Sequence, residues 1–539
     1  MKIVIIGGGA AGASCAARLR RLDENAQILI IEKTNEISIA NCGLPYYVSG
    51  VISERENLLV STPAKFKNWF NIDIKLNTEV IKINRQDKNL ELAGGEIITY
   101  DKLVLAQGAN PVMPNFEGAC LDKIFNVRTL KDADRIKDFI SKNNPQNAVI
   151  IGGGFIGIEM AENLVLAGLT TTLVEAGSRI LTQVDEEIAQ DAQNTMIKNG
   201  INLILSDEVK KFSRNKIILN SGKEIEYDFV ITAIGVRPEI KLAKEAGLNT
   251  GHGIIVNDFL QTNDENIYAA GDNIEAKDFV SEINTLTPLA GPANRQGRII
   301  ADNICGIKSN YKKTQGTSVI KIFDLTIAGT GNNEKQLIQK NIPYWKTYIF
   351  SNSHAGYYPD ASRILFKLLF DDSGKILGAQ ASGKEGVEKR IDVISSVMRL
   401  NGTVQDMIDC ELCYAPPYSS AKDAVNILGM NADNILRGFV KPAYFEDLET
   451  SYLIDVRPET AFKTNTIPNA INIPITEIRN RLEDFPKDKK VVLFCNTGYT
   501  SYCASRILIQ HGFNNVYSLM GGIELYKILK QMKQTLIKL

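Results

Sequence analysis

The chain has 539 residues, which at about 150 residues per domain predicts three or four domains, and 44% of them are hydrophobic, enough to fill buried cores. Its 61 basic and 62 acidic residues leave a net charge of -1, so no overall field favours binding to a nucleic-acid backbone or an anionic membrane. This composition excludes a disordered chain and leaves small molecules as the expected partners.

The N-terminal segment and the cysteines indicate a cytoplasmic protein. The uncharged run 3–17 is shorter than the roughly 18 apolar residues that suggest a membrane span, and Gly7, Gly8 and Gly9 would interrupt the apolar core of a signal peptide. The 8 cysteines have irregular spacing, unlike the disulfide pattern of a small secreted domain. We therefore expect reduced thiols and no membrane association.

The first chemical motif is a glycine-rich turn between a strand and a helix. An apolar strand is expected over 2–6, a helix follows the turn, and a second apolar run, 28–31, ends at Glu32. The glycines of the pattern GxGxxG are Gly7, Gly9 and Gly12. They suit a tight turn, close approach of a pyrophosphate and packing of the helix on the strand, while Glu32 stands where a ribose-binding carboxylate is expected.

The same arrangement occurs a second time. A strand over 148–151 leads into a second glycine pattern, and residues 173–174 lead to Glu175. The glycines of this second pattern are Gly152, Gly154 and Gly157. Two dinucleotides are therefore expected on one chain, which suggests electron transfer between a bound flavin and a diffusible nicotinamide.

Over roughly residues 1–430 the chain resembles the pyridine nucleotide-disulfide oxidoreductases, flavoproteins that bind two dinucleotides. The resemblance implies that the first glycine motif holds FAD and the second holds NAD(P)H. Residues 106–108 and 233–235 match the paired turns of such proteins, and Asp272 matches the residue that binds the flavin ribityl chain. The implied cofactor-binding residues outside the two glycine patterns are Glu32, Lys33, Gly108, Glu175, Gly235, Gly271 and Asp272.

The residue after the second nucleotide strand bears on the choice of coenzyme. Glu175 is placed to accept hydrogen bonds from a free ribose 2′-hydroxyl and to repel a 2′-phosphate. NADH is therefore favoured. Arg179, four residues later, is a cation that weakens the preference for NADH, so NADPH stays possible.

The expected redox group is Cys42, in the segment 38–47. Relatives that reduce glutathione or lipoamide carry a second cysteine five positions later, and position 47 here is Tyr. A single thiolate beside a flavin forms a mixed disulfide with a substrate thiol or a sulfenic acid, and either returns to the thiolate with two electrons. The alternative is a buried, inert cysteine.

This segment closely resembles the coenzyme A-disulfide reductase branch, in which the matching cysteine carries CoA or a persulfide sulfur. The resemblance implies a homodimer in which Tyr357 and Tyr414 reach the cysteine of the other subunit, where a hydroxyl group can protonate a leaving thiol. Ordinary dimer packing is the alternative for both tyrosines. Positions that match the CoA site are Ser14, Arg18, Arg21, Ser38, Asn41, Asn294 and Lys422. Arg18 and Arg21 share a helix face that suits a CoA phosphate or, equally, solvent.

Cys410 and Cys413 form a CxxC pair immediately before Tyr414. The pair suggests a dithiol or half of a zinc site, but no second cysteine pair or histidine cluster accompanies it, and the chain has 3 histidines. We therefore expect no metal site, and we assign the pair no function.

The C-terminal segment 446–539 contains a cysteine between a strand and a helix. Cys495 follows the apolar strand 490–494 and precedes a helical pattern, so backbone NH groups and the helix dipole would stabilise a thiolate or persulfide there. Together with the segments 451–457 and 467–474, this pattern resembles a rhodanese domain. Rhodanese loops usually carry Arg at the position of Thr500, so capture of an anionic donor such as thiosulfate is disfavoured. Asp455 and Arg457 are expected to brace the fold, and an inactive or phosphatase-like domain is the alternative.

The expected fold is α/β, with two Rossmann-like dinucleotide-binding domains, an α+β dimerisation domain and a C-terminal α/β rhodanese domain. The expected ranges are 1–110 with 250–320 for FAD, 111–249 for NAD(P)H, 321–430 for dimerisation, 431–445 for a linker and 446–539 for the rhodanese-like domain. The expected activity is reduction of CoA persulfide, CoA disulfide or related low-molecular-weight persulfides by NAD(P)H, with sulfur passed from Cys495 to CoA.

Two other classes of function are weighed against this one. A sulfenic-acid NADH oxidase or peroxidase is disfavoured, because such relatives usually place His in the first glycine turn, where this chain has Ala10 and Ala11. The other class is a redox-sensing flavoprotein module without turnover, which rapid NADH consumption with a persulfide would exclude.

Overall fold

The computed structural model describes residues 1–113 and 115–538, so Pro114 and Leu539, which fall within the expected ranges 111–249 and 446–539, lie outside the described residues. The chain divides into two compact units. The first unit comprises Met1–Ala176 and Gly200–Gly316, and the second comprises Gly177–Asn199 and Thr317–Leu539.

The N-terminal sheet of the first unit is parallel and has the strand order β19-β7-β1-β2-β3. Its strands are β1 (Lys2–Ile6), β2 (Gln27–Ile31), β3 (Asp73–Lys75), β7 (Lys102–Leu105) and β19 (Ile267–Ala269). The apolar run of β1 is almost entirely buried, and Ile3 pairs with Ile28 of β2. A parallel sheet is covered on both faces, which explains why its central strand is a continuous apolar run.

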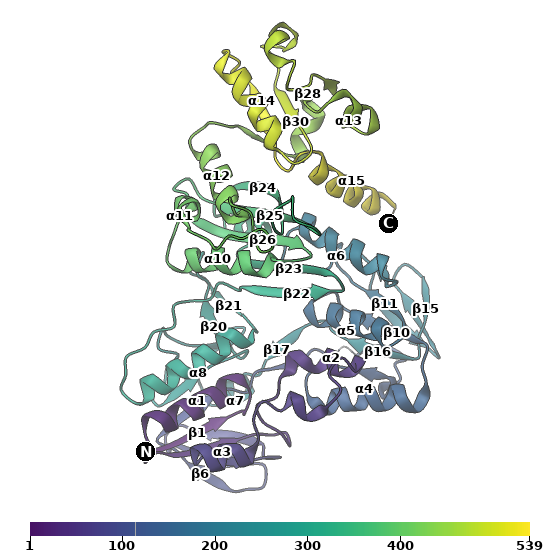
Figure 1. Ribbon diagram of the computed structural model, residues 1–539. Coiled ribbons are helices and arrows are strands. Elements are labelled where there is room, and N and C mark those ends of the chain that lie inside the picture. The colour runs from purple at the N-terminus through teal and green to yellow at the C-terminus, as the bar shows by residue number, and fades with distance from the viewer. Residues whose placement is uncertain (114, 539) are drawn as a thin grey trace. The chain divides into compact units, whose positions relative to one another are not determined.

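Helices α1 (Ala10–Leu22) and α8 (Ala290–Ile304) pack side by side near this sheet (Figure 1). Two polar contacts join them, because Ser14 Oγ donates to Asn294 Oδ1, and Arg18 Nε lies 2.8 Å from Asp302 Oδ1. The sheet and the helix pair place the loop after β1 at the carboxyl edge of the strands, where α/β proteins bind ligands.

A second parallel sheet of the first unit has the order β12-β11-β10-β16-β9. Its strands are β9 (Ile124–Phe125), β10 (Asn147–Ile151), β11 (Thr170–Val174), β12 (Asn202–Ile204) and β16 (Phe229–Thr232). The glycine turn after β10 leads into α5 (Phe155–Leu166), so this half repeats the strand–turn–helix unit of the first sheet.

The remaining elements of the first unit are short strands and connecting helices. The helices are α2 (Leu44–Ser49), α3 (Pro63–Phe70), α4 (Leu130–Asn143) and α7 (Lys241–Glu245). The strands are β4 (Val80–Asn84), β5 (Asn89–Leu92), β6 (Ile97–Thr99), β8 (Ala109–Pro111), β13 (Val209–Ser213), β14 (Lys216–Leu219), β15 (Glu224–Glu226), β17 (Val236–Pro238), β18 (Ile254–Ile255), β20 (Ile274–Lys277) and β21 (Asn284–Thr285).

The second unit contains an antiparallel sheet of order β22-β23-β26-β25-β24. Its strands are β22 (Ser318–Ile322), β23 (Leu325–Gly331), β24 (Trp345–Asn352), β25 (Arg363–Phe370) and β26 (Ile376–Gly383). Its helices are α6 (Glu186–Lys198), α9 (Glu334–Gln339), α10 (Val387–Arg399), α11 (Val404–Asp409) and α12 (Ala424–Leu436). α12 continues through Leu436, so the first residues of the expected connector 431–445 are helical.

The interior of this unit holds a buried lysine. Lys367 of β25 is completely buried, and its Nζ lies 2.8 Å from Asp185, 2.6 Å from Glu187 and in contact with Glu334. These three acids are the one group of potential metal ligands found among the described residues. The lysine ammonium lies among them and offsets part of their charge, and Lys346 contributes a second positive charge at 3.1 Å from Glu334.

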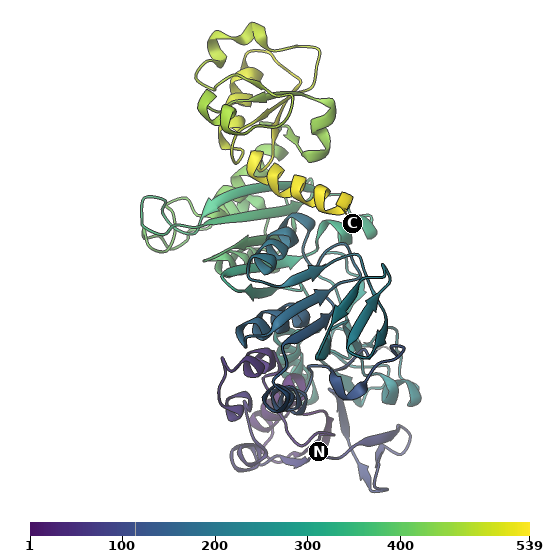
Figure 2. The same cartoon turned by 90° about the vertical axis from the view of Figure 1, so that its right-hand side faces the viewer.

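The C-terminal part of the second unit is a parallel sheet of order β27-β31-β30-β28-β29. Its elements are β27 (Pro442–Ala443), β28 (Tyr452–Asp455), α13 (Glu459–Thr464), β29 (Ile471–Asn472), β30 (Val491–Phe494), α14 (Tyr499–Gln510), β31 (Val516–Leu519) and α15 (Gly522–Lys538). Figure 2 shows α15 extending away from this sheet, and it lies against α6.

The expected α/β architecture is confirmed, with two nucleotide-type parallel sheets, one antiparallel sheet and a C-terminal parallel sheet. None of the described helices combines the length and apolar character needed to span a membrane.

Candidate functional site

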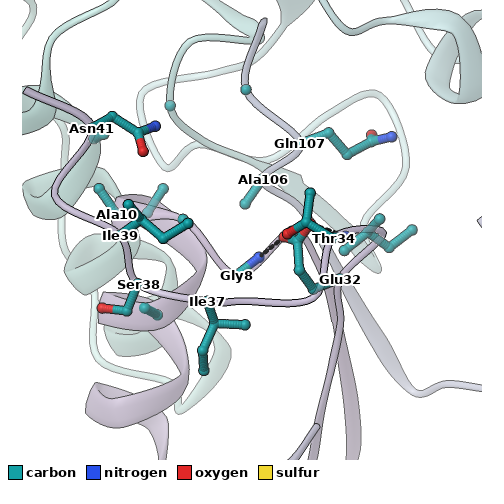
Figure 3. Close-up of a pocket in the computed structure, with 18 of the residues that line it drawn as sticks. Gly8, Ala10, Glu32, Thr34, Ile37, Ser38, Ile39, Asn41, Ala106 and Gln107 are labelled. Atoms are coloured by element: carbon teal, nitrogen blue, oxygen red, sulfur yellow. Dashed lines mark hydrogen bonds between the residues drawn. The ribbon is translucent and has the colours of Figure 1, made fainter. Parts of the chain in front are cut away.

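A cavity of the first unit lies over the carboxyl edge of the N-terminal sheet and has a volume of about 1410 Å³. Both the first glycine loop and Cys42 line it, as do the turns that carry Gln107 and Asp272. Figure 3 shows Gly8 and Gln107 on its wall. A pocket for one small ligand usually measures about 300–1,000 Å³. The cavity therefore has room for a large cofactor together with part of a second ligand.

The first glycine loop has the backbone that a pyrophosphate site needs. Gly7 adopts φ +104°, and a Cβ on Gly12 would collide with the carbonyl oxygen of Gly7. Gly9, by contrast, has nothing within 4 Å of the place where a Cβ would stand. The backbone is thus free for a ligand to approach at Gly9, while the other two glycines are required by the turn itself.

The second loop repeats these features. Gly152 adopts φ +111°, a Cβ on Gly157 would collide with Gly152, and Gly154 faces open space. Glu175 lies beside this loop, because its Oε2 accepts a 2.6 Å hydrogen bond from the backbone N–H of Gly153. Gly235 has φ +106° in the turn before β17.

Glu32 lies at the matching place in the first loop. Its Oε2 accepts a 2.8 Å hydrogen bond from the N–H of Gly8, and its Oε1 accepts bonds from the N–H and hydroxyl of Thr34 (Figure 3). These bonds fix the carboxylate at the edge of the cavity. Lys33 also lines the cavity.

The cavity fits FAD at its cofactor end. Gln107 Oε1 is buried and has no hydrogen-bond partner among the described residues, so it requires a ligand donor. Asp272 lines the same wall, and its Oδ2 lies 3.2 Å from Arg128 Nη2. Gly108 and Gly271, both at positive φ, belong to these two turns. An orphaned acceptor, a carboxylate and an open glycine loop are the groups that a flavin dinucleotide would engage.

Cys42 lies in the turn Asn41–Gly43, directly before α2, and is exposed on the cavity wall. The alternative of a buried, inert cysteine is therefore wrong for this residue, whereas Cys15 in α1 is buried. The pKa of the Cys42 thiol is raised, first by partial desolvation and then by the carboxylates of Glu159 and Asp272. Arg128 acts in the opposite direction and favours the thiolate.

Glu159 and Tyr46 are neighbours of this thiol that the sequence motifs did not identify. Helix α2 packs on α5, and Ser49 Oγ donates a 2.6 Å hydrogen bond to Asn163 Oδ1. Burial, and then the carboxylate of Glu162, raise the pKa of Glu159 to about 7. Burial and the same two acids raise the pKa of Tyr46 to about 12. The Cys42 thiol thus has an acid with a near-neutral pKa among its electrostatic neighbours.

Six of the seven positions suggested for CoA line this one cavity with Cys42. They are Ser14, Arg18, Arg21, Ser38, Asn41 and Asn294. Lys422 is an exposed residue of the second unit. The cavity is also lined by Lys65, Trp69 and Arg298, which the sequence motifs did not identify and which have no fixed spacing from a recognisable turn.

The two tyrosines suggested for proton transfer lie together in the second unit. The hydroxyl oxygens of Tyr357 and Tyr414 are 2.7 Å apart, and both side chains are exposed. Hydrogen bonding to Tyr414 raises the pKa of Tyr357, so the Tyr357 hydroxyl keeps its proton at neutral pH.

The CxxC pair has two different environments. Cys413 is exposed, while Cys410 is half-buried and its carbonyl oxygen accepts a 2.9 Å bond from Asn426 Nδ2. Burial and the carboxylates of Asp406 and Asp409 raise the pKa of the Cys410 thiol, which disfavours its reactive thiolate form.

Cys495 occupies a loop of donors before α14. Its Sγ accepts a 3.2 Å hydrogen bond from the N–H of Gly498, and the hydroxyl of Ser501 lies 3.7 Å away. The buried Arg457 pairs with Asp455 at 2.7 Å and donates to Asn496 Oδ1, so it braces the loop and does not face a ligand. The expected bracing role of this ion pair is consistent with these bonds.

The guanidinium group of Arg179 forms an ion pair and a hydrogen bond within the second unit. Its Nη1 lies 3.2 Å from Glu186 Oε1, and its Nη2 donates to the carbonyl oxygen of Val184. These bonds reduce its capacity to attract a 2′-phosphate, which favours NADH over NADPH.

Comparisons with family models match three segments of the chain. Residues 1–297 match the pyridine nucleotide-disulphide oxidoreductases, and residues 317–425 match the dimerisation domain of that family. The chain belongs to this family. Residues 442–529 match the rhodanese-like domain, so this oxidoreductase carries a C-terminal rhodanese-like domain.

Two solved structures resemble the whole chain. Reduced Bacillus anthracis CoADR-RHD is 46% identical, covers 98% of both chains and superposes with a TM-score of 0.96. A NAD-dependent persulfide reductase from A. fulgidus is 35% identical, covers 98% of this chain and 100% of its own, and has a TM-score of 0.91.

Two curated relatives match the part before the rhodanese-like domain. An NADH oxidase of Methanocaldococcus jannaschii is 36% identical over 441 residues, 80% of this chain and 98% of the relative. A coenzyme A disulfide reductase of Staphylococcus haemolyticus is 34% identical over 443 residues, 80% of this chain and 100% of the relative.

Proposed function

We propose that this protein is an FAD-dependent oxidoreductase that uses NADH to reduce coenzyme A disulfide, coenzyme A persulfide or related low-molecular-weight persulfides. The observation that carries the proposal is that Cys42 is exposed and is the one cysteine among the described residues that line the cavity with the FAD-type glycine loop. Relatives named coenzyme A disulfide reductase and NAD-dependent persulfide reductase support this substrate class.

We assign the cofactor sites by the same reasoning. Gly7, Gly9, Gly12, Glu32, Lys33, Gly108, Gly271 and Asp272 would hold FAD, and Gly152, Gly154, Gly157, Glu175 and Gly235 would hold NADH. The domain ranges follow: 1–110 with 250–320 for FAD, 111–249 for NADH, 321–430 for dimerisation and 446–539 for the rhodanese-like domain. When bound, FAD supplies the relay between a two-electron hydride donor and a thiol.

The protein's own chemistry centres on Cys42. Its thiolate attacks one sulfur of CoA disulfide, the S–S bond breaks, and a Cys42–CoA mixed disulfide forms as the first CoA thiol leaves with a proton. Two electrons from NADH and one further proton then regenerate the thiolate and release the second CoA thiol. With a CoA persulfide, attack on the outer sulfur leaves that sulfur on Cys42, and the same two electrons release it as hydrogen sulfide.

The proton for the leaving thiol would come from the tyrosine pair. The dimerisation domain supports a homodimer, in which Tyr357 and Tyr414 of one subunit would reach Cys42 of the other. Either hydroxyl can donate to the other. One tyrosine could therefore give its proton to the leaving thiol and regain a proton from solvent through the second tyrosine.

The rhodanese-like domain would deliver sulfur. Cys495 would load a persulfide sulfur and pass it to the CoA thiol, whose flexible arm carries it to Cys42. Thr500, in place of the usual Arg, and the inward-facing Arg457 leave the loop without the cation that an anionic donor needs. The donor is therefore a persulfide and not thiosulfate. We place this chemistry in the cytoplasm, where thiols stay reduced.

The test is NADH consumption by the purified flavoprotein, measured without oxygen in the presence of CoA disulfide, CoA persulfide, glutathione disulfide or hydrogen peroxide. A separate assay uses oxygen as the sole acceptor. The proposal predicts that the two CoA compounds support rapid turnover and that the other three support little. Rapid turnover with oxygen or peroxide alone would instead favour the second candidate, an NADH oxidase or peroxidase. The Methanocaldococcus relative, which is named NADH oxidase, supports this second candidate.

A further inference from the structure

Hydrogen bonds close the base of the loop that carries Tyr357, which we call the first tyrosine loop and which runs from Ser353 to Ser362. The backbone N–H of Ser353 donates to the carbonyl oxygen of Ser362 at 2.7 Å, and the N–H of Ser362 donates to Ser353 Oγ at 3.1 Å. The buried His354 donates from Nε2 to the carbonyl oxygen of Pro359 at 2.9 Å. Because Tyr357 itself is 76% exposed, the loop and not side-chain packing determines where its hydroxyl lies.

Tyr414 belongs to a second tyrosine loop, residues 410–423, between α11 and α12. These residues form neither a helix nor a strand. One backbone hydrogen bond joins the two loops, because the N–H of Ala355 donates to the carbonyl oxygen of Pro416 at 3.2 Å. The two tyrosine hydroxyls nevertheless lie 2.7 Å apart, so a further contact is expected to hold the loops in place relative to each other.

A buried ion pair contacts both tyrosine loops. Arg390 of α10 and Asp423, the residue that caps α12, are almost completely buried, and Arg390 Nη2 lies 3.1 Å from Asp423 Oδ2. The same nitrogen donates to the carbonyl oxygen of Ser353 at 2.8 Å, at the base of the first loop. Asp423 Oδ2 accepts a 2.7 Å hydrogen bond from the hydroxyl of Ser419, a buried residue of the second loop. Each partner of the ion pair therefore holds one tyrosine loop.

The charges and the space at this ion pair suit a fixed geometry. Burial acts to raise the pKa of Asp423, but hydrogen bonds from Val425 and Ser419 and the charge of Arg390 lower it, so the carboxylate stays ionised at neutral pH. Arg390 Nη1 donates to the carbonyl oxygen of Gly386 at 2.9 Å, and a Cβ on Gly386 would collide with that nitrogen. A buried ion pair adds little net stability over well-packed apolar side chains, whereas the planar fork of an arginine holds several acceptors in one arrangement. The pair therefore suits a role in positioning.

We propose that Arg390, Asp423 and Ser419 are positioning residues that keep the hydroxyls of Tyr357 and Tyr414 within hydrogen-bonding distance of each other. The inference rests on the proposed role of the two tyrosines as proton donors and deepens it, because a donor protonates a leaving thiol only from a fixed place. The three residues act through the tyrosine loops and take no part in the reaction themselves.

The ionisation of Tyr357 reports the contact between the hydroxyls without any turnover. The hydrogen bond to Tyr414 raises the pKa of Tyr357, so this pKa should fall when the two hydroxyls separate. We would place 3-fluorotyrosine at position 357 of the full-length, flavin-loaded protein and follow its fluorine NMR shift against pH. The same label in Tyr414→Phe gives the pKa without the hydrogen bond.

A matched pair of serines separates positioning from general damage. In Ser419→Ala the pKa of the labelled tyrosine should move toward its value in Tyr414→Phe. Ser382→Ala removes another buried hydroxyl of the same unit, which donates to Asp191 at 2.5 Å, and should leave that pKa unchanged. An unchanged pKa in Ser419→Ala, or equal shifts in both variants, would overturn the proposal.

Arg390→Lys tests the other partner of the ion pair. Lysine keeps the charge beside Asp423 but lacks the fork that also reaches the carbonyl oxygens of Ser353 and Gly386. The pKa of the labelled tyrosine should therefore fall in this variant too, and an unchanged pKa would contradict the proposed role of Arg390. If Arg390→Lys does not fold, the two serine variants still decide the proposal.

Steady-state kinetics connects the contact to the reaction. With CoA disulfide, Ser419→Ala should lower kcat about tenfold and leave KM within about twofold, while Ser382→Ala should change neither. An unchanged kcat in Ser419→Ala would contradict the positioning role. If the wild-type protein reduces no CoA substrate, the proposed function fails, whereas the fluorine titration still decides whether the ion pair holds the two tyrosines together.

Discussion

Replacement of Glu159 by Gln tests the electrostatics around the redox thiol. In the folded protein the pKa of this carboxyl is raised to about 7 from an ordinary 4.5, first by burial and then by Glu162. The folded state therefore holds a proton that the unfolded chain releases between these two pH values. Stability from this group is fully present below pH 4.5, decreases as the pH rises to about 7 and is lost above it.

The size of the effect follows from the same numbers. One pKa unit corresponds to about 1.4 kcal/mol, so the shift from 4.5 to about 7 is worth at most about 3.5 kcal/mol, and solvent screening of a partly exposed group reduces this to about 1–2 kcal/mol. Gln carries no charge at any pH. We expect Glu159→Gln to unfold at a higher temperature than the wild type at pH 8 and at the same temperature at pH 4.5.

The assay is thermal unfolding of both proteins at pH 4.5, 6 and 8, together with the rate of Cys42 alkylation by iodoacetamide at each pH. Removal of the Glu159 carboxylate should lower the pKa of the Cys42 thiol, because that carboxylate opposes the thiolate. Glu226→Gln, a change at an exposed residue of β15, should alter neither measurement. A stability difference independent of pH, with unchanged alkylation, would refute the reasoning.

Three further predictions concern the proposed chemistry. Cys42→Ser should keep the yellow flavin and bind NADH, but its CoA disulfide turnover should fall by about a thousandfold or more in a steady-state assay of NADH oxidation. Wild-type-like turnover would contradict the single-thiol mechanism. NADH should exceed NADPH in kcat/KM by at least about tenfold, because the 2′-phosphate loses the hydrogen bond to Glu175 and meets its charge; equal values would exclude this role. Cys495→Ser should abolish NADH oxidation driven by a protein persulfide while CoA disulfide turnover stays nearly intact, and equal losses with both substrates would instead indicate a structural role for the C-terminal domain.

The sequence predicts the nucleotide-type halves well because their signals are local. The turn between β1 and α1 requires glycine at Gly7, which adopts φ +104°, and at Gly12, where a Cβ would collide with the carbonyl oxygen of Gly7 five residues earlier. Glu32 follows the next strand, and its carboxylate accepts a hydrogen bond from the N–H of Gly8 in the same loop. The glycines, the two strands and the acid therefore stand at fixed distances from one another in the sequence. That spacing predicts both the strand bounds and the candidate cofactor residues.

Part of the cavity lining could not be predicted because it depends on packing between distant segments. Trp69 lines the cavity from the end of α3, which Arg20 of α1 joins through a hydrogen bond to Phe70 across 50 residues, with no associated motif. The raised pKa of Glu159 has the same origin, since helix periodicity alone does not show that α2 covers that part of α5. Long-range burial, and not local propensity, therefore determines the residues that the motifs miss.

The most direct test of the account is to trap the covalent intermediate. The flavin-loaded protein is reduced with one equivalent of NADH without oxygen, mixed with CoA disulfide, quenched in acid after a few milliseconds and digested for mass spectrometry. The account predicts CoA in disulfide linkage to the peptide that contains Cys42, and its disappearance when excess NADH is present. CoA on the Cys495 peptide alone, or turnover with no CoA bound to Cys42 at any time, would contradict it.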